Sequence, residues 1–197
     1  RLYELNRAAA KYFHSALLSP EGQAGMDYLT KTRALSRATD HHFGLGFAPD
    51  CFFGLSNAMH AAGYTDEELY VAFLCGKSKK TGKPYDYFRN RVIFPIIDTA
   101  GNVVAFGGRG MGDSKPKYLN TNDTPVFKKG RNLFALNFAK NHCAGELIIC
   151  EGYMDVIALH AAGFENAVAS LGTALTDEQA RLLTRYTKRI VMLYDSD

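Results

Sequence analysis

Carboxylates follow two apolar segments of this 197-residue sequence in an arrangement that suits a metal ion. Glu151 comes directly after the first segment and Asp155 four residues later, whereas Asp195 and Asp197 come directly after the second. Clustered carboxylates repel one another unless a cation neutralises them. Mg²⁺ prefers oxygen ligands and is typically held by one or two carboxylates together with waters and phosphates. These residues therefore predict a site for Mg²⁺, or for Mn²⁺ in its place.

Structural roles explain the same carboxylates when each is taken singly. Asp155 could complement a helix dipole, and Asp195 with Asp197 could form an ordinary acidic loop.

The four cysteines form no C-x-x-C pair, which argues against a zinc finger or ribbon in this chain. We therefore expect free, buried thiols and no zinc site in this chain.

The last part of the chain alternates apolar strands with helices, which is typical of a parallel sheet with right-handed crossovers. Ligands bind beyond the carboxyl ends of such strands. We therefore expect Glu151 and Asp195 to share one edge of the sheet, with Asp155 on the helix face nearest to Glu151. The strands are predicted at residues 146–150, 166–172 and 189–195, and the helices at 154–163 and 176–186.

The first part of the chain is predicted to contain short helices and then a β-hairpin. Apolar residues recur at helical spacing, Thr65 and Glu68 form a capping box, and two β-rich segments flank a turn. The predicted fold class is α/β, with a mixed α+β amino-terminal subdomain at residues 1–144 and a partial βαβαβ sheet at 145–197. Helices are predicted over 1–18, 21–29, from 36 onward and over 57–62, and strands over 91–98 and 102–110.

Composition indicates a folded protein. Hydrophobic residues make up 47% of the chain and charged residues 22%, which is enough apolar material for a core. No apolar segment approaches the roughly 20 residues of a membrane span. The net charge of +3 identifies no partner. We expect a soluble, cytoplasmic protein without a membrane partner.

Basic residues cluster in two segments that suit contacts with nucleic acid. Six lysines and arginines between Lys77 and Arg91 are interleaved with Tyr85, Tyr87 and Phe88, a composition suited to phosphate contacts and base stacking. A second cluster lies within residues 109–131. The alternative is a solvated loop, which is the favoured interpretation for the first four residues of the Lys77 segment.

Several motifs, taken in order, resemble those of the bacterial DnaG-type DNA primases. EGYMDV, which begins at Glu151, and the D-x-D of Asp195 and Asp197 are similar to the signature of the Toprim fold of topoisomerases and primases. RVIFPI, FGGR, PKYLN, the F-x-K-G that begins at Phe127, and ASLGTALT are similar to primase-specific motifs. The resemblance spans nearly the whole chain.

The resemblance implies roles for individual residues. Glu151 and Asp155 would be catalytic, and Glu151, Asp195 and Asp197 would bind metal. In the sequence Arg33 is followed by alanine where the family usually has glycine. The residues implied in binding nucleic acid or nucleotides are Arg33, Arg109, Lys117 and Lys129.

The implied activity is that of a DNA-directed RNA polymerase that makes short RNA primers by metal-dependent nucleotidyl transfer. Its partners would be a single-stranded DNA template, ribonucleotides, the RNA primer and, through a region outside this chain, the replicative helicase. It would act in the bacterial cytoplasm, at the nucleoid and replisome. Whether Glu151 is a metal ligand or a general acid or base stays open.

Two other functions fit part of the pattern. A Toprim nuclease or topoisomerase would use the same carboxylates on a phosphodiester, and a non-catalytic module would use only the basic residues to bind single-stranded nucleic acid. The family's zinc and helicase-binding domains lie outside this chain, and a further acidic motif is expected after Asp197. We therefore expect a fragment of the polymerase core that is inactive by itself.

Overall fold

The structure is a computed structural model that describes residues 1–172 and 174–194. Contacts divide the chain into two compact units. The first holds Arg1–Pro95 and Val103–Val126, and the second holds Ile96–Asn102 and the chain from Phe127 onward. Residues 127–144 therefore lie in the second unit, and the domain boundary expected after residue 144 stays a prediction.

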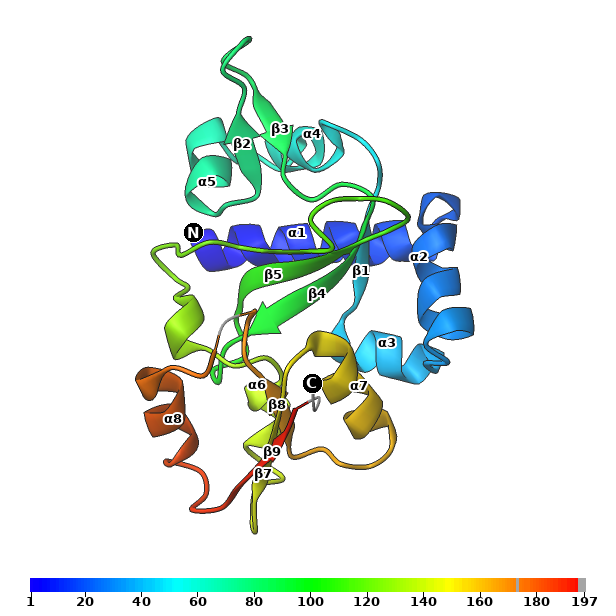
Figure 1. The fold of residues 1–197 in the computed structure, drawn as a ribbon. Coiled ribbons are helices and arrows are strands. Elements are labelled where there is room, and N and C mark those ends of the chain that lie inside the picture. The colour runs from blue at the N-terminus through cyan, green and yellow to red at the C-terminus, as the bar shows by residue number, and fades with distance from the viewer. Residues whose placement is uncertain (173, 195–197) are drawn as a thin grey trace. The chain divides into compact units, whose positions relative to one another are not determined.

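The first unit combines helices with a four-stranded sheet of order β1-β4-β5-β6, of which β1 pairs antiparallel with β4 and β5 with β6. A separate two-stranded hairpin, β2–β3, projects beside α4 and α5 (Figure 1). The elements in chain order are α1 (Leu2–Leu18), a 3-10 turn η1 (Pro20–Gly22), α2 (Gln23–Asp27), a π-helical turn η2 (Tyr28–Thr32), α3 (Arg37–Phe43), β1 (Gly46–Ala48), α4 (Gly54–Ala61), α5 (Asp66–Val71), β2 (Cys75–Lys77), β3 (Pro84–Asp86), β4 (Arg91–Ile97), β5 (Val103–Gly110) and β6 (Tyr118–Asn120).

The core of this unit forms where α1 packs along the sheet (Figure 1). Apolar residues of α1 recur every three or four positions, so one face of the helix is buried. Phe13 on that face meets Phe106 edge to face at 5.4 Å and Phe88 at 6.3 Å between ring centres. Such aromatic pairs add to the stability gained from burial alone.

In the second unit the helix predicted to end at residue 186 ends at Leu183. The predicted helices of the first unit are present, with two differences in their bounds. The second one changes from 3-10 through α to π pitch and continues to Thr32, beyond the predicted end at residue 29. The helix predicted from residue 57 begins at Gly54. Its first turn is capped by Asp86, which accepts hydrogen bonds from the N–H groups of Leu55 and Ser56, and a cap so distant in sequence leaves no local pattern.

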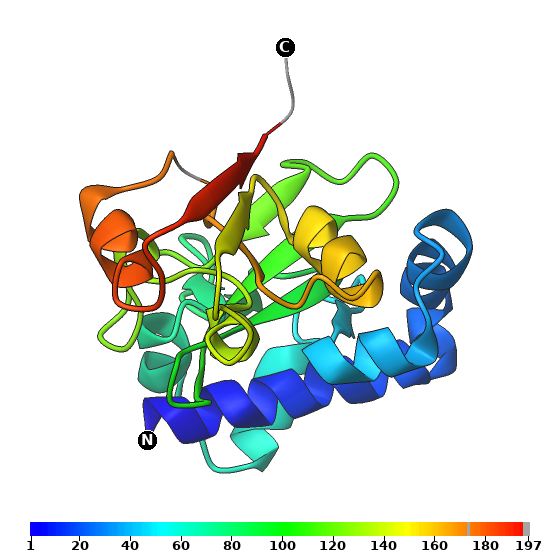
Figure 2. The same cartoon turned by 90° about the horizontal axis from the view of Figure 1, so that it is seen from below.

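The second unit contains the predicted parallel sheet, in the order β8-β7-β9. The two crossovers run in opposite directions from each other across the sheet, so right-handed connections place α7 and α8 on opposite faces, as Figures 1 and 2 show. The strands are shorter than predicted. The elements are η3 (Lys129–Arg131), α6 (Leu136–Ala139), β7 (Leu147–Cys150), α7 (Tyr153–Ala161), β8 (Ala167–Ala169), α8 (Asp177–Leu183) and β9 (Ile190–Leu193).

The structure describes all four cysteines. All four thiols are free; Cys75 and Cys150 are buried, Cys143 is half-buried and Cys51 is exposed. Burial was therefore predicted correctly for Cys75 and Cys150 and wrongly for Cys51.

In the part of the chain that the structure describes, no helix has both the length and the apolar character to cross a membrane.

Candidate active site

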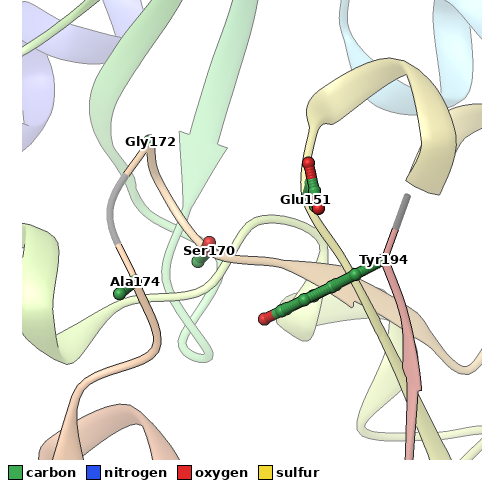
Figure 3. Close-up of a pocket in the computed structure, with 5 residues that line it drawn as sticks. All are labelled: Glu151, Ser170, Gly172, Ala174 and Tyr194. Carbon is green, nitrogen blue, oxygen red and sulfur yellow. The ribbon is translucent and has the colours of Figure 1, made fainter. Parts of the chain in front are cut away.

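A cavity of about 370 Å³ lies at the carboxyl ends of the three parallel strands. Glu151 follows β7, Ser170 follows β8 and Tyr194 follows β9, and all three residues line it, with Gly172 and Ala174 on the loop after β8. Figure 3 shows the Tyr194 side chain extending across the cavity from β9, with Glu151 above it. The expectation that Glu151 lies at the edge where ligands bind in parallel sheets fits this geometry.

Glu151 and Asp155 are both exposed at this edge. Glu151 extends from β7, the middle strand, and Asp155 lies in the first turn of α7. One oxygen of Asp155 accepts a hydrogen bond from the N–H of Gly152 at 3.2 Å. Asp155 therefore caps the first turn of α7, the end of the helix at which a negative charge also complements the dipole, and its second carboxylate oxygen has no part in this bond.

The electrostatics of the edge favour a cation. Burial, followed by the negative charge of Glu151, raises the pKa of Tyr194. Burial and the charge of Asp155 raise the pKa of Cys150 to about 11. Tyr194 therefore stays a neutral phenol, able to donate a hydrogen bond into the cavity. No sequence signal singled it out, because tyrosines are frequent in this chain.

A divalent cation fits the donors that are present. Glu151 and Asp155 supply carboxylate oxygens, the donor type that Mg²⁺ prefers, and a cavity of this size leaves room for its waters. Among residues 1–172 and 174–194 there is no group of three or more histidine, cysteine or acidic side chains placed to hold a metal. The other two predicted ligands, Asp195 and Asp197, lie outside the described residues.

Arg33 and Arg109, which were predicted to bind nucleic acid, meet on the ring of Tyr28. The Arg109 guanidinium lies 4.3 Å and that of Arg33 lies 5.4 Å from the ring centre. Arg33 Nε also donates to the Tyr28 hydroxyl at 2.8 Å. Tyr28 opens the π-helical turn η2, and such turns frequently occur at functional sites. The turn thus presents Arg33 beside strand β5.

Lys117 lies near this pair, and Lys129 belongs to the other unit. The N–H of Gly110 donates to the carbonyl of Lys117 at 2.8 Å, and Lys117 comes directly before Tyr118, the residue of β6 that pairs with Arg109. The Lys117 side chain is exposed. Lys129 lies in η3 of the second unit. Arg33 and Arg109 are therefore the two predicted binding residues that the structure brings together, and Lys117 is their neighbour along the backbone.

A further cavity in the first unit, of about 340 Å³, combines cations with an aromatic face. The Arg89 guanidinium lies 3.8 Å from the centre of the Phe52 ring, and Phe52 is 55% exposed. Among the described residues, Arg89 Nε is buried without a hydrogen-bond partner. Lys115 and Ser114 also line the cavity. An exposed ring beside cations suits a nucleobase and its phosphate.

Two residues of the predicted stacking segment have structural roles instead. Phe88 is 1% exposed and packs in the core, so the expectation that it stacks on bases is wrong. Arg91 is 4% exposed and donates from Nη1 to the carbonyl of Pro116 at 2.8 Å. Burial, and then the charge of Arg89, lowers its pKa. Phe88 lies in the segment before β4, and Arg91 is the first of six consecutive buried residues of that strand.

Two family models match the chain. Residues 12–140 match the N-terminal domain of the DNA primase catalytic core, and residues 145–197 match the Toprim domain. Proteins named DNA primase are 50% identical to this chain in Clostridium acetobutylicum and 48% identical in Deinococcus radiodurans. Each match covers 100% of this chain but only 32% and 34% of the relative. The chain therefore spans about a third of the length of these relatives.

Solved structures show the same architecture. The RNA polymerase domain of the Mycobacterium tuberculosis primase DnaG is 35% identical, with a TM-score of 0.93 over 100% of this chain and 67% of that one. A DnaG primase catalytic domain bound to ssDNA is 38% identical, with a TM-score of 0.89 over 100% of this chain and 63% of that one. A DNA primase domain from Pseudomonas aeruginosa is 42% identical, with a TM-score of 0.91 over 100% and 62%.

Proposed function

Because this chain belongs to the DNA primase catalytic-core family, we propose that the protein synthesises short RNA primers on a single-stranded DNA template. The match of residues 12–140 to the primase core is the observation that carries this proposal. A Toprim nuclease or topoisomerase shares the carboxylate edge, and the amino-terminal match favours a primase over both. A purely nucleic-acid-binding module would leave the cavity beside Glu151 without a role.

The basic residues of the first unit would bind the template. Arg33 and Arg109 present guanidinium groups around Tyr28, and Arg89 stacks on the exposed ring of Phe52. Guanidinium groups contact phosphates in a fork geometry, and exposed rings stack on bases of any sequence. A related catalytic domain binds ssDNA, which supports the same ligand for this chain. Lys117 and Lys129 would add phosphate contacts.

The carboxylates at the carboxyl ends of the parallel strands, which form an acidic edge of the sheet, would catalyse nucleotide transfer. Glu151 and Asp155, with Asp195 and Asp197 from beyond β9, would hold Mg²⁺, or Mn²⁺ in its place. The bound ion would neutralise charge on the nucleotide phosphates and favour attack by the primer 3′-hydroxyl. Glu151 projects from the middle strand and so is held in position from both sides, while Tyr194 can donate a hydrogen bond to a phosphate oxygen. The ribonucleotides and the RNA primer are the substrates this assignment requires.

Two further assignments follow from the family alone. The replicative helicase would be the partner that brings the protein to its template, through a region outside this chain. The protein would then act in the bacterial cytoplasm at the replisome. Neither assignment draws on the geometry of the two units.

The test is incorporation of ribonucleotides on a single-stranded template by the protein at its full natural length, beside its Glu151→Gln variant. The variant should lose synthesis by a factor of about a hundred or more, because transfer depends on precise positioning of charge. Its melting temperature should stay close to that of the unchanged protein or rise, since Glu151 is exposed and one negative charge is removed.

A matched control keeps this test specific. Glu165→Gln removes an exposed carboxylate of the same unit that lies outside the cavity, and it should leave synthesis unchanged. Normal synthesis by a folded Glu151→Gln protein would place the catalytic centre elsewhere. Template binding without synthesis by the unchanged protein would support the binding module instead.

A further inference from the structure

A second hollow of the carboxyl-terminal unit is lined mainly by arginines. Its volume is about 360 Å³, and its lining consists of Arg131, Glu178, Arg181, Leu182 and Arg185. Three cationic side chains and one carboxylate give the lining a formal charge of +2. None of these residues lines the cavity beside Glu151, so the two sites are separate.

Buried hydrogen bonds hold the two walls of the hollow together. Gln179 on α8 is 0% exposed, and its Nε2 donates to the carbonyls of Lys129 at 3.0 Å and Asn132 at 2.8 Å. The hydroxyl of Thr176 donates to the carbonyl of Gly130 at 2.6 Å. These bonds fix the η3 turn against α8. The position of Arg131 relative to the arginines of α8 is therefore set by the fold.

The arginines differ in their partners. Arg131 is oriented by Glu178, whose Oε1 accepts a hydrogen bond from Nε at 3.1 Å and lies 3.1 Å from Nη2 in an ion pair. Arg181 and Arg185 are exposed, and neither makes an ion pair with any residue that the structure describes. Arg181 lies in the last turn of α8 and Arg185 in the turn that follows it, and both line the same hollow, where their like charges repel. An anion between them would remove this repulsion.

We propose that this hollow binds a phosphate group through Arg181 and Arg185, with Arg131 as a third donor. The planar guanidinium matches the geometry of phosphate oxygens and forms paired hydrogen bonds with them. The phosphate would come from a free nucleotide or from the backbone of a single strand. The proposal rests on the hollow alone and stands whether or not the protein makes primers.

The experiment measures binding by calorimetry in the presence of EDTA, so that no metal bridges the ligand to the acidic edge. The probes are inorganic pyrophosphate and an oligothymidylate. The variants are Arg181→Gln/Arg185→Gln and a matched control, Arg7→Gln/Lys11→Gln, which removes an exposed basic pair at the same spacing from α1. Thermal melts verify that each variant is folded.

Binding of pyrophosphate should weaken about tenfold or more in the Arg181→Gln/Arg185→Gln variant and should be unchanged in the control. If the natural ligand is a strand backbone, the salt slope of oligothymidylate binding should also fall by about 0.7 for each arginine removed. Weakening of both probes would assign the strand, and weakening of pyrophosphate alone would assign a free nucleotide. The proposal is overturned if the unchanged protein binds neither probe, if the double variant binds both normally, or if the control loses as much affinity.

Discussion

The thiol of Cys75 lies 3.5 Å from a carboxylate oxygen of Asp86 and donates to it inside the first unit. Asp86 is 2% exposed and also accepts the N–H groups of Leu55 at 2.7 Å and Ser56 at 3.0 Å. Burial raises the pKa of Asp86 in spite of these hydrogen bonds. One carboxylate thus joins the β2–β3 hairpin to the start of α4.

Removing this carboxylate should destabilise the protein. Asp86→Ala leaves two buried N–H groups without acceptors, which costs roughly 2 kcal/mol or more of the free energy of unfolding. Urea unfolding followed by circular dichroism measures the change. Asp113→Ala, in an exposed loop, is the control and should have almost no effect. Equal stability of the two variants would show that water replaces Asp86 at the helix.

The contribution of Asp86 should also depend on pH. Because burial raises its pKa in the folded protein, its contribution is fully present below the ordinary value of 3.8 and is lost as the pH rises through the folded-state pKa. The free energy of unfolding of the unchanged protein, relative to Asp86→Asn, should therefore fall as the pH rises above 3.8 and level off once the pH exceeds the folded-state pKa. A difference that is flat or rises over this range would contradict the assigned direction.

The four thiols should react with an alkylating reagent in a fixed order. The thiolate is the reactive form, and burial raises the pKa of Cys150 to about 11 and that of Cys75 further still. Cys51 is exposed and should be modified first by iodoacetamide at about pH 8. Mass spectrometry of peptides over time measures the order. Modification of Cys75 as fast as Cys51 in the folded protein would show that the hairpin opens readily.

The predicted template-binding residues should act through phosphate contacts. Arg109→Ala/Lys117→Ala/Lys129→Ala should weaken binding of single-stranded DNA and lower its salt slope by about 2, or roughly 0.7 for each contact. The same titration on Arg7→Ala/Lys11→Ala should match the unchanged protein. Wild-type affinity and slope in the triple variant would mean that these side chains form an ordinary solvated surface.

Local patterns in the sequence were enough to predict the parts of the fold that local physics determines. The parallel sheet and the capping box of Thr65 were predicted from hydrophobic periodicity and short-range hydrogen bonding, and the structure confirms them. Because parallel strands end at one edge, the position of Glu151 followed from the same reasoning. The strands β1, β2, β3 and β6 were missed, since three residues are too few to show an alternating pattern.

The remaining features depend on contacts between distant segments. The early start of α4 depends on Asp86, and the pairing of Arg33 with Arg109 depends on Tyr28, so no window of sequence contains either arrangement. Composition alone also could not tell inward from outward side chains in the segment that holds Phe88 and Arg91. Both side chains are buried, and burial is a property of the complete fold.

The path of the chain between the two units has a consequence for synthesis on the ribosome. The chain enters the second unit at Ile96, leaves it at Asn102 and joins it again at Phe127. Within that unit, the Nζ of Lys140 donates to the carbonyl of Thr99 at 2.6 Å. A growing chain emerges from its amino terminus, so residues 96–102 are exposed to solvent before Lys140 has been translated. A protein translated from Phe127 onward would therefore lack residues 96–102. These residues connect β4 to β5 of the first unit but belong to the second unit.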